Sequence, residues 1–312
     1  MNRRNFTKKA LFGTMLMSYA SLGCNKSNDM KKNYVRLGGQ VFDKYNDPGA
    51  WIQSLKKYGY RAAYCPVGPD TPDDDIEAYR KTAEQNDIVI SEVGAWSNPI
   101  SPDETMRKEA IEKCTIALEL AEKIQANCCV NISGSLNLEQ WAGPHKDNLN
   151  DDTFNLVVET TRKIIDSVNP TRTFFALEPM PWAFPYSPDS YLRLVKAMDR
   201  SRFGVHFDPV NMVTSPYVLF NNGEMIKEAF KILGPHIRSC HAKDVYIKED
   251  IYMPNINEIR PGLGTLDYAT FLTELSKLKD IPLMMEHLNT QEEYNMAADY
   301  IRSVGKKVNI DL

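Results

Sequence analysis

Short apolar segments alternate with longer amphipathic segments along the chain from Tyr34 onward. Each apolar segment has the length of a buried strand, whereas the segments between them repeat apolar residues at helical spacing. The expected strands lie in YVRLGG, RAAYCPV, DIVISEVGAW, NCCVNISG, TFFALEPM, RFGVHFDPV, IRSCHAKDV and IPLMMEHL. Helices are expected within residues 47–59, 72–86, 104–126, 151–168, 187–200, 223–233, 265–278 and 290–307. Several helical segments begin with a residue type that caps helices, as in SPDSY and TLDY.

Regular alternation of strands and helices predicts parallel strands covered by helices. Eight such units over roughly 280 residues match the number and size of a (β/α)8 TIM barrel. The alternative is a doubly wound open sheet, but no glycine-rich phosphate-binding sequence follows the first strand. We therefore predict an α/β protein with a single TIM-barrel domain over residues 34–312.

The first 24 residues have the pattern of a targeting segment rather than of the fold. Arg3 and Arg4 precede Phe6, two lysines and a short apolar stretch, and the stretch ends in SLGC. This pattern resembles a twin-arginine export signal followed by a lipoprotein cleavage box. It predicts a signal over residues 1–24, a lipid on Cys24, and a polar tether over residues 25–33. The alternative is a disordered basic N-terminus with an incidental cysteine.

The lipoprotein hypothesis predicts that the chain is exported to the periplasm and held at a membrane only through Cys24. Replacing Cys24 by alanine should abolish labelling of the expressed protein with a fatty-acid probe. Replacing Arg3 and Arg4 by lysine should leave unprocessed precursor in the cytoplasm. A Cys24→Ala protein that still takes up the fatty-acid label would contradict the hypothesis.

Composition narrows the classes of partner and cofactor. The net charge is −4 and the isoelectric point about 5.8, which argues against nucleic acid as a partner. Five cysteines follow Cys24, and their spacing matches no zinc-binding pattern. Their apolar neighbours predict buried thiols. They are Cys65, Cys114, Cys128, Cys129 and Cys240.

Charged residues follow four consecutive predicted strands at the point where each strand ends. Glu178, Asp208, His241 and Glu286 stand at these positions. Active sites of TIM barrels lie at the C-terminal ends of the strands. Because side chains alternate along a strand, Ala176 and Glu178 are expected to point to the same face, the inside of the barrel. The four side chains should therefore meet at one rim.

Three carboxylates in one place repel one another unless a cation neutralises them. A site of carboxylate oxygens with one imidazole nitrogen suits Mn²⁺, Mg²⁺ or Co²⁺, and Zn²⁺ is a further candidate. The cofactor expected from these residues is therefore one divalent metal ion. The alternative for each residue is an ion pair or a hydrogen-bonded polar group in the barrel.

The sequences LEPMP, HFDPVNM, CHAKDV, RPGLGTLDY and MMEHL, in that order, resemble the xylose isomerase-like superfamily. That superfamily includes sugar isomerases, ketose 3-epimerases, inosose dehydratases and apurinic endonucleases. The resemblance implies metal ligation by Glu178, Asp208, His241 and Glu286, with the two glutamates also transferring protons. Many members have a histidine three residues after the strand-six aspartate, where this chain has Asn211.

Further residues near the predicted rim are candidates for contact with a substrate. The predicted substrate-binding residues are Lys243, Asn211, Trp182, His206 and Arg260. Trp96, Glu92 and Asn131 are additional candidates for the lining of the pocket.

Most of these candidates have an alternative role. Lys243 either contacts an enediolate oxygen or forms a rim ion pair with Asp244. His206 either orients a ligand or packs in the core. The tryptophans either stack on a sugar ring or pack against loops, and Arg260 either reaches the site or remains exposed. His287 follows a predicted ligand and should point the other way, so we expect it to be structural.

The predicted function is isomerisation or epimerisation of an unphosphorylated sugar or polyol by metal-assisted enolisation. An alternative with the same first step is a lyase or dehydratase acting on a 3-keto-glycoside or an inosose. A non-catalytic sugar-binding lipoprotein is another alternative, and a homo-oligomer is compatible with all of them. An endonuclease-like phosphoesterase would need additional histidines from early strands, but no histidine precedes His145.

Overall fold

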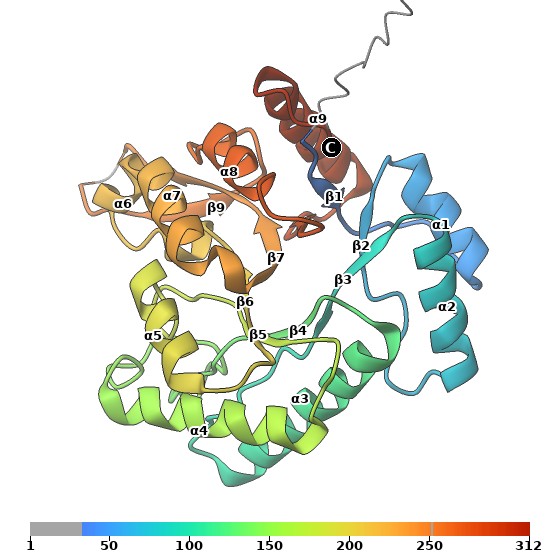
Figure 1. Cartoon of the computed structure of the whole chain (residues 1–312). Coiled ribbons are helices and arrows are strands. Elements are labelled where there is room, and N and C mark those ends of the chain that lie inside the picture. Colours follow the sequence, from blue (N-terminus) through green and yellow to red (C-terminus); the bar gives the residue numbers. More distant parts are fainter. Residues whose placement is uncertain (1–32, 251) are drawn as a thin grey trace, which may run out of the picture. The chain divides into compact units, whose positions relative to one another are not determined.

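Eight parallel strands close into a barrel in the computed structural model, which describes residues 33–250 and 252–312 (Figure 1). Their order around the barrel is β1-β10-β7-β6-β5-β4-β3-β2. The barrel strands are β1 (Arg36–Gly38), β2 (Ala62–Tyr64), β3 (Val89–Gly94), β4 (Cys128–Asn131), β5 (Phe175–Leu177), β6 (Phe203–Phe207), β7 (Ile237–Ala242) and β10 (Pro282–Met285). The prediction of a (β/α)8 TIM barrel is confirmed.

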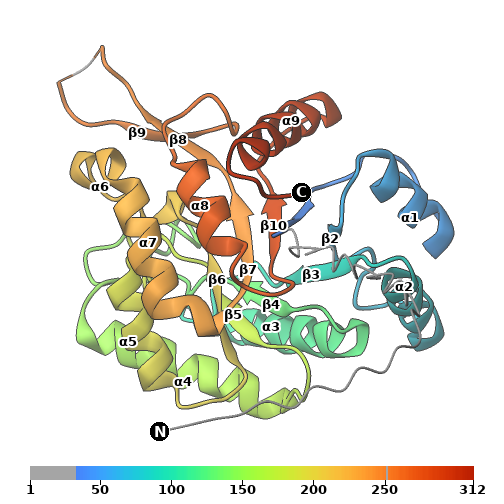
Figure 2. The same ribbon diagram turned by 45° about the horizontal axis from the view of Figure 1, so that its top comes forward.

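Helices connect successive strands and surround the barrel (Figures 1 and 2). The helices are α1 (Pro48–Lys57), α2 (Asp73–Gln85), α3 (Glu104–Ile124), α4 (Asp151–Val168), α5 (Pro188–Met198), α6 (Pro216–Phe220), α7 (Asn222–Leu233), α8 (Tyr268–Leu275) and α9 (Gln291–Lys307). Ser187 and Thr290 start α5 and α9 with capping boxes, in which side chain and backbone bond reciprocally. Asp267 caps α8 in the sequence TLDY.

Inward and outward side chains alternate on the strands as the sequence predicts. Ala176 packs with Cys128 and Val130 in a small cluster of its own. Cys128 Sγ lies 3.1 Å from Ser239 Oγ, and these residues belong to strands that are not neighbours. This contact therefore crosses the interior of the barrel. Phe175 and other outward residues join the larger core between the strands and the helices.

One hairpin is added to the barrel between β7 and α8. Its antiparallel strands are β8 (Asp244–Ile247) and β9 (Ile256–Ile259), and in Figure 2 its loop extends past α6. Asp244 fixes the base of the hairpin, because its buried carboxylate accepts backbone hydrogen bonds from Gly262, Gly264 and Leu266. The alternative pairing of Asp244 with Lys243 is therefore wrong.

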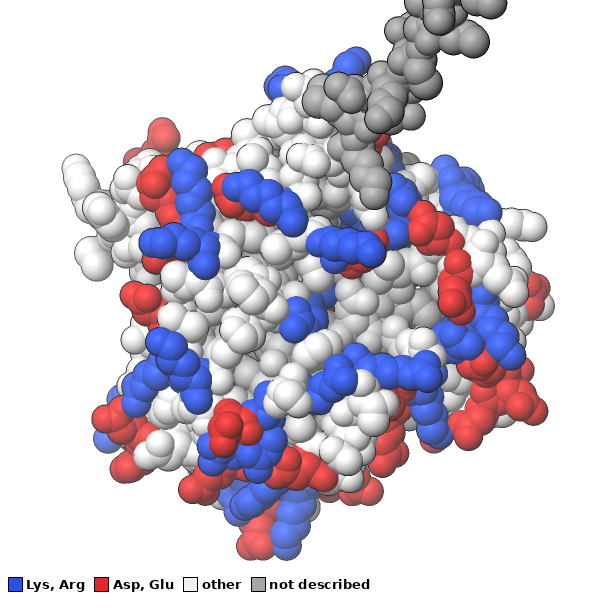
Figure 3. Space-filling view, in the orientation of Figure 1, with Lys and Arg blue, Asp and Glu red and all other residues white. Residues whose placement is uncertain are grey.

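The remaining cysteines are free thiols in the described part of the chain. Four are buried and Cys65 is half-buried, so the prediction of buried thiols is confirmed for those four. On the face shown in Figure 3, basic and acidic side chains are interspersed. No described helix has both the length and the apolar composition needed to cross a membrane.

The predicted targeting segment lies outside the described residues, and so do its Arg3, Arg4 and Cys24 and nearly all of the predicted tether. Export and lipid attachment therefore stay predictions from the sequence.

Candidate active site

Four neighbouring strands place four potential metal ligands together. Glu178 follows β5, Asp208 follows β6, His241 lies on β7 and Glu286 follows β10. One potential ligand atom from each of these residues lies within 4.8 Å of the others. The sequence therefore predicted the convergence of these four side chains correctly.

Local hydrogen bonds aim two of the carboxylates at this cluster. The Glu178 backbone N–H donates to the carbonyl of Asn131 on the adjacent strand at 2.8 Å, which continues the barrel ladder to the rim. Asp208 Oδ1 accepts backbone N–H groups from Val210 and Asn211 at 2.9 and 3.3 Å. These bonds form the turn typical of an aspartate after a strand and leave Oδ2 directed at the cluster.

The Lys243 ammonium lies among the carboxylates of the cluster. Its Nζ is 2.8 Å from Asp208 Oδ2, 2.6 Å from Glu286 Oε1 and 3.7 Å from Glu178 Oε1. Only 2% of the lysine is exposed. Although burial opposes the charged form, the surrounding carboxylates hold the pKa of Lys243 well above its usual range. Lys243 is therefore the internal counter-ion of the site.

His241 bridges two groups of carboxylates. Its Nδ1 lies 3.0 Å from Glu178 Oε1 and 2.8 Å from Glu286 Oε1, and its Nε2 lies 2.9 Å from Glu92 Oε1. Despite burial, Glu286 and Glu92 hold the pKa of His241 well above its usual value. A carboxylate on one ring nitrogen commonly orients the other nitrogen toward a metal. Glu92 is in position to do this for His241.

The two candidate proton-transfer groups have opposite electrostatic environments. Burial raises the pKa of Glu178 to about 7, with Lys243 opposing the shift and Glu286 reinforcing it. Glu286 is half-buried, and although burial opposes the charged form, His241 and Lys243 hold its pKa well below the usual range. In the metal-free protein a proton therefore resides more readily on Glu178 than on Glu286.

The residues present fit a divalent metal. Asp208 Oδ2 and Glu286 Oε1 make no hydrogen bond among the described residues, although Lys243 is near both. Buried carboxylate oxygens are costly unless a cation contacts them; Lys243 supplies that charge here, and a divalent ion at the same oxygens would take its place. The donor set of three carboxylates and one imidazole suits hard or intermediate divalent ions.

A second group of potential ligands lies deeper, formed by Glu92, His206 and His241. His206 Nδ1 lies 2.5 Å from Ser239 Oγ, and His206 Nε2 has no hydrogen-bond partner among the described residues. Burial, with a smaller contribution from His241, lowers the pKa of His206 to about 4, so the ring is neutral. His206 is thus buried beneath the rim and lines neither of the cavities described next.

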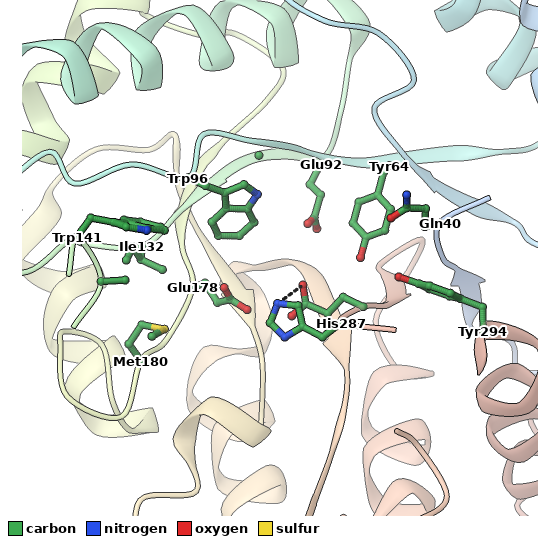
Figure 4. A pocket seen from close by; sticks show the side chains of 13 residues that line it. Gln40, Tyr64, Glu92, Trp96, Ile132, Trp141, Glu178, Met180, His287 and Tyr294 are labelled. Atoms are coloured by element: carbon green, nitrogen blue, oxygen red, sulfur yellow. Dashed lines mark ion pairs between the residues drawn. The ribbon is translucent and has the colours of Figure 1, made fainter. Parts of the chain in front are cut away.

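Two adjoining cavities open above the cluster, and we call them lobe 1 and lobe 2. Lobe 1 has a volume of about 490 Å³, and Figure 4 shows aromatic rings and carboxylates directed into it. Lobe 2 has a volume of about 500 Å³, and amide, hydroxyl and charged side chains lie in its wall beside apolar ones. Glu178, Met180 and His287 line both lobes, so they mark the junction. The ring-bearing residues of lobe 1 are Tyr64, Trp96, Trp141, His287 and Tyr294.

Several predicted contact residues lie in these cavities. Trp96 and Glu92 line lobe 1, whereas Asn211, Trp182 and Lys243 line lobe 2. The Trp182 indole N–H donates to the carbonyl of Ala142 at 2.7 Å, which joins the loop after β5 to the loop after β4.

Besides His206, two predicted contacts are placed elsewhere. Asn131 is fully buried and uses its amide to bond Ser97 and Cys114, so it does not line the pocket as expected. Arg260 lines neither lobe, and its guanidinium donates to the carbonyl of Pro261 at 3.0 Å.

His287 was wrongly expected to be structural and to point away from the site. The strand β10 ends at Met285, and His287 has a φ of 56°, so strand alternation no longer applies. Its ring is turned into the cleft, where Nδ1 lies 2.8 Å from Glu258 Oε1 (Figure 4 shows the ring). Glu258 and Trp141 were also missed, because they lie in the hairpin and a loop whose positions depend on tertiary contacts.

The amino-acid sequence matches the family model of the xylose isomerase-like TIM barrel over residues 52–304. The chain belongs to this family. A comparison with curated proteins gives no match.

Solved structures show how widely this fold is shared. The D-psicose 3-epimerase of Clostridium cellulolyticum, solved with D-tagatose, is 16% identical with a TM-score of 0.59; the match covers 87% of this chain and 96% of that one. A xylose isomerase-like protein from Mycobacterium smegmatis in complex with magnesium is 16% identical with a TM-score of 0.60, covering 90% and 97%. Endonuclease IV from Thermus thermophilus is 14% identical with a TM-score of 0.65, covering 87% and 99%.

These similarities show the fold but do not determine which reaction the protein catalyses. An epimerase and an endonuclease both have barrels that superpose on this chain. The side chains in the cleft must therefore decide which reaction is best supported.

Proposed function

We propose that the protein is a divalent-metal-dependent sugar isomerase or epimerase that acts by enolisation on an unphosphorylated sugar or polyol. The observation that carries the proposal is the placement of Glu178 and Glu286. Both carboxylates line lobe 1 and belong to the cluster of potential ligands, and they come from strands separated in the barrel by β6 and β7, which carry the other two members. The similar epimerase solved with a ketohexose and the similar protein solved with magnesium support this choice.

Glu178, Asp208, His241 and Glu286 would hold the metal. A bound divalent ion would polarise a carbonyl and its neighbouring hydroxyl and so acidify the C–H between them. One of the two glutamates would accept that proton on a carboxylate oxygen, and the other would return a proton at the opposite face or at the neighbouring carbon.

Residues around the glutamates have the chemistry to bind a sugar. Trp96 and Trp141 offer aromatic faces in lobe 1 for the apolar side of a ring, and Asn211 offers an amide in lobe 2. The basic side chains among the lining residues of both lobes are Lys243 and His287, and both are paired with carboxylates. Without an unpaired cation the cleft favours a neutral substrate over a sugar phosphate or a nucleic-acid backbone.

A lyase or dehydratase acting on a 3-keto-glycoside or inosose is the second candidate. It would use the same two glutamates for the first proton transfer and would differ only when a leaving group stands β to the carbanion. Lobe 2 favours this candidate, because it provides room next to Glu178 for the departing part of a substrate.

The proposed function is tested by incubating the Mn²⁺-loaded protein in D₂O with ketoses, inososes and 3-keto-glycosides and following the reaction by NMR. We expect deuterium to enter at the carbon next to the carbonyl, together with formation of an epimer or isomer. An alkene or a released sugar instead would identify the lyase. Sugar binding with no exchange at any carbon in the whole panel would contradict both candidates.

Metal binding should depend on Asp208 and His241. We expect Asp208→Ala and His241→Ala to lower affinity for the ion by at least ~10–100-fold, because each removes a potential ligand. Affinity should also fall with decreasing pH, because Glu178 and His241 must release protons to bind a metal: His241, whose pKa is raised well above its usual value, takes up its proton first, and Glu178 follows near pH 7.

The measurement is elemental analysis after dialysis, combined with titration calorimetry across a pH series. Asn257→Ala is a matched control, because this residue lines lobe 2 without belonging to the cluster. Equal metal content in the parent and in both ligand variants would exclude the assigned site.

A further inference from the structure

The two lobes contribute unequally to the proposed reaction. Both Glu178 and Glu286 line lobe 1, whereas Glu286 does not line lobe 2. Lobe 1 alone has a volume within the ~300–1,000 Å³ typical of small-molecule sites. The proton transfers can therefore be completed on a ring held in lobe 1. An isomerisation or epimerisation therefore does not require the rest of lobe 2.

Lobe 2 nevertheless has the lining of a binding site. Asn211 and Thr214 present an amide and a hydroxyl, and the Thr214 hydroxyl has no hydrogen bond within the described residues. Trp182 adds an indole ring that is 36% exposed and held in place by its bond to Ala142. Hydrogen-bonding groups beside an aromatic face suit a sugar ring, which has hydroxyls at its edge and C–H groups on its face.

The junction between the lobes indicates how a ligand would pass from one to the other. Glu178, Met180 and His287 line both cavities. His287 is fixed there by Glu258 at 2.8 Å, and Glu258 belongs to the hairpin that borders lobe 2. A ring in lobe 1 that carries a substituent over Glu178 would therefore direct that substituent into lobe 2.

We propose that the substrate is a disaccharide-like glycoside, with the reacting ring in lobe 1 and a second sugar ring in lobe 2. The inference rests on the proposed function for the assignment of the reacting ring. Lobe 2 favours a neutral sugar over an anionic group, because the carboxylates of Glu178 and Glu258 lie in its wall. It favours a sugar over an aryl group because several of its lining side chains are polar.

Binding of matched sugars to the Mn²⁺-loaded full chain tests this inference by calorimetry. D-fructose is compared with maltulose and lactulose, which are the same ketose carrying a second hexose, and D-glucose is compared with maltose and cellobiose. We expect at least one disaccharide to bind ~10-fold more tightly than its matched monosaccharide, equivalent to about 1.4 kcal/mol. A phenyl glycoside provides the aryl comparison.

Thr214→Trp should remove most of that advantage. Thr214 is exposed at the wall of lobe 2, so a tryptophan there can fill the lobe without disturbing the core. We expect the disaccharide to lose ~10-fold in affinity and the monosaccharide to change much less. Tyr217→Trp is the matched control, because Tyr217 is 78% exposed and lines neither lobe.

Three results would overturn the two-ring substrate. The first is that no disaccharide binds more tightly than its matched monosaccharide, and the second is that the phenyl glycoside binds best. The third is that Thr214→Trp lowers the affinity for a disaccharide and for its matched monosaccharide equally. Because these are binding measurements, they do not depend on turnover. Deuterium exchange on the same sugars tests the proposed enolisation separately, so failure of either hypothesis can be recognised.

Discussion

Replacing Glu178 or Glu286 by glutamine should lower turnover by ~10²–10⁴-fold, the loss typical of a positioned acid or base. Glutamine keeps the size of the side chain and one oxygen that can contact a metal, but it cannot accept or deliver the proton. Both variants should therefore fold, bind sugar and retain part of their metal. If the two residues act at different faces or carbons, one variant should still exchange the substrate C–H with deuterium without forming product.

Turnover and deuterium exchange are measured with the metal content of each variant determined in the same samples. Glu249→Gln is the control, because Glu249 is exposed on the hairpin and lines neither lobe. It should lose far less activity than either cluster variant. Full turnover in Glu178→Gln or Glu286→Gln, with metal bound, would end the assignment of these residues to proton transfer.

Replacing Lys243 by methionine should destabilise the metal-free protein by about 3–5 kcal/mol, the usual cost of removing one partner from a buried ion pair. The reason is that Asp208, Glu178 and Glu286 would remain buried beside one another without their ammonium. A divalent ion should compensate for the missing charge. Metal should therefore stabilise the methionine variant more than it stabilises the parent.

Urea unfolding with and without Mn²⁺ measures both effects, and calorimetry measures the accompanying gain in metal affinity. Lys248→Met on the exposed part of the hairpin is the matched control and should change stability little. If the lysine variant were as stable as the parent without metal, Lys243 would not be the internal counter-ion of the site.

Much of this site follows from the sequence because strand alternation and barrel topology act together. The apolar segment before Glu178 fixes which side of β5 faces inward, and the same holds for Asp208 and His241 on the next two strands. The rim position of each residue then follows from parallel strands ending at one edge. Helix α4 also follows from the local sequence pattern, since the helix predicted over residues 151–168 has these bounds in the structure.

The remaining features depend on contacts that sequence patterns do not contain. A single residue separates the end of β7 from the start of β8. The sequence pattern therefore predicted one strand there, and the hairpin was missed. His287 enters the cleft because of a positive φ that alternation cannot predict. Trp141 lies in a loop that the Trp182–Ala142 hydrogen bond joins to the loop after β5.

A crystal structure of the full chain soaked with Mn²⁺, with anomalous scattering recorded, tests the central claim most directly. We predict one strong anomalous peak contacted by Glu178, Asp208, His241 and Glu286, with the Lys243 ammonium displaced from its present position between Asp208 and Glu286. A peak confined to the deeper group of Glu92, His206 and His241, or no peak at the rim, would contradict the proposed metal centre.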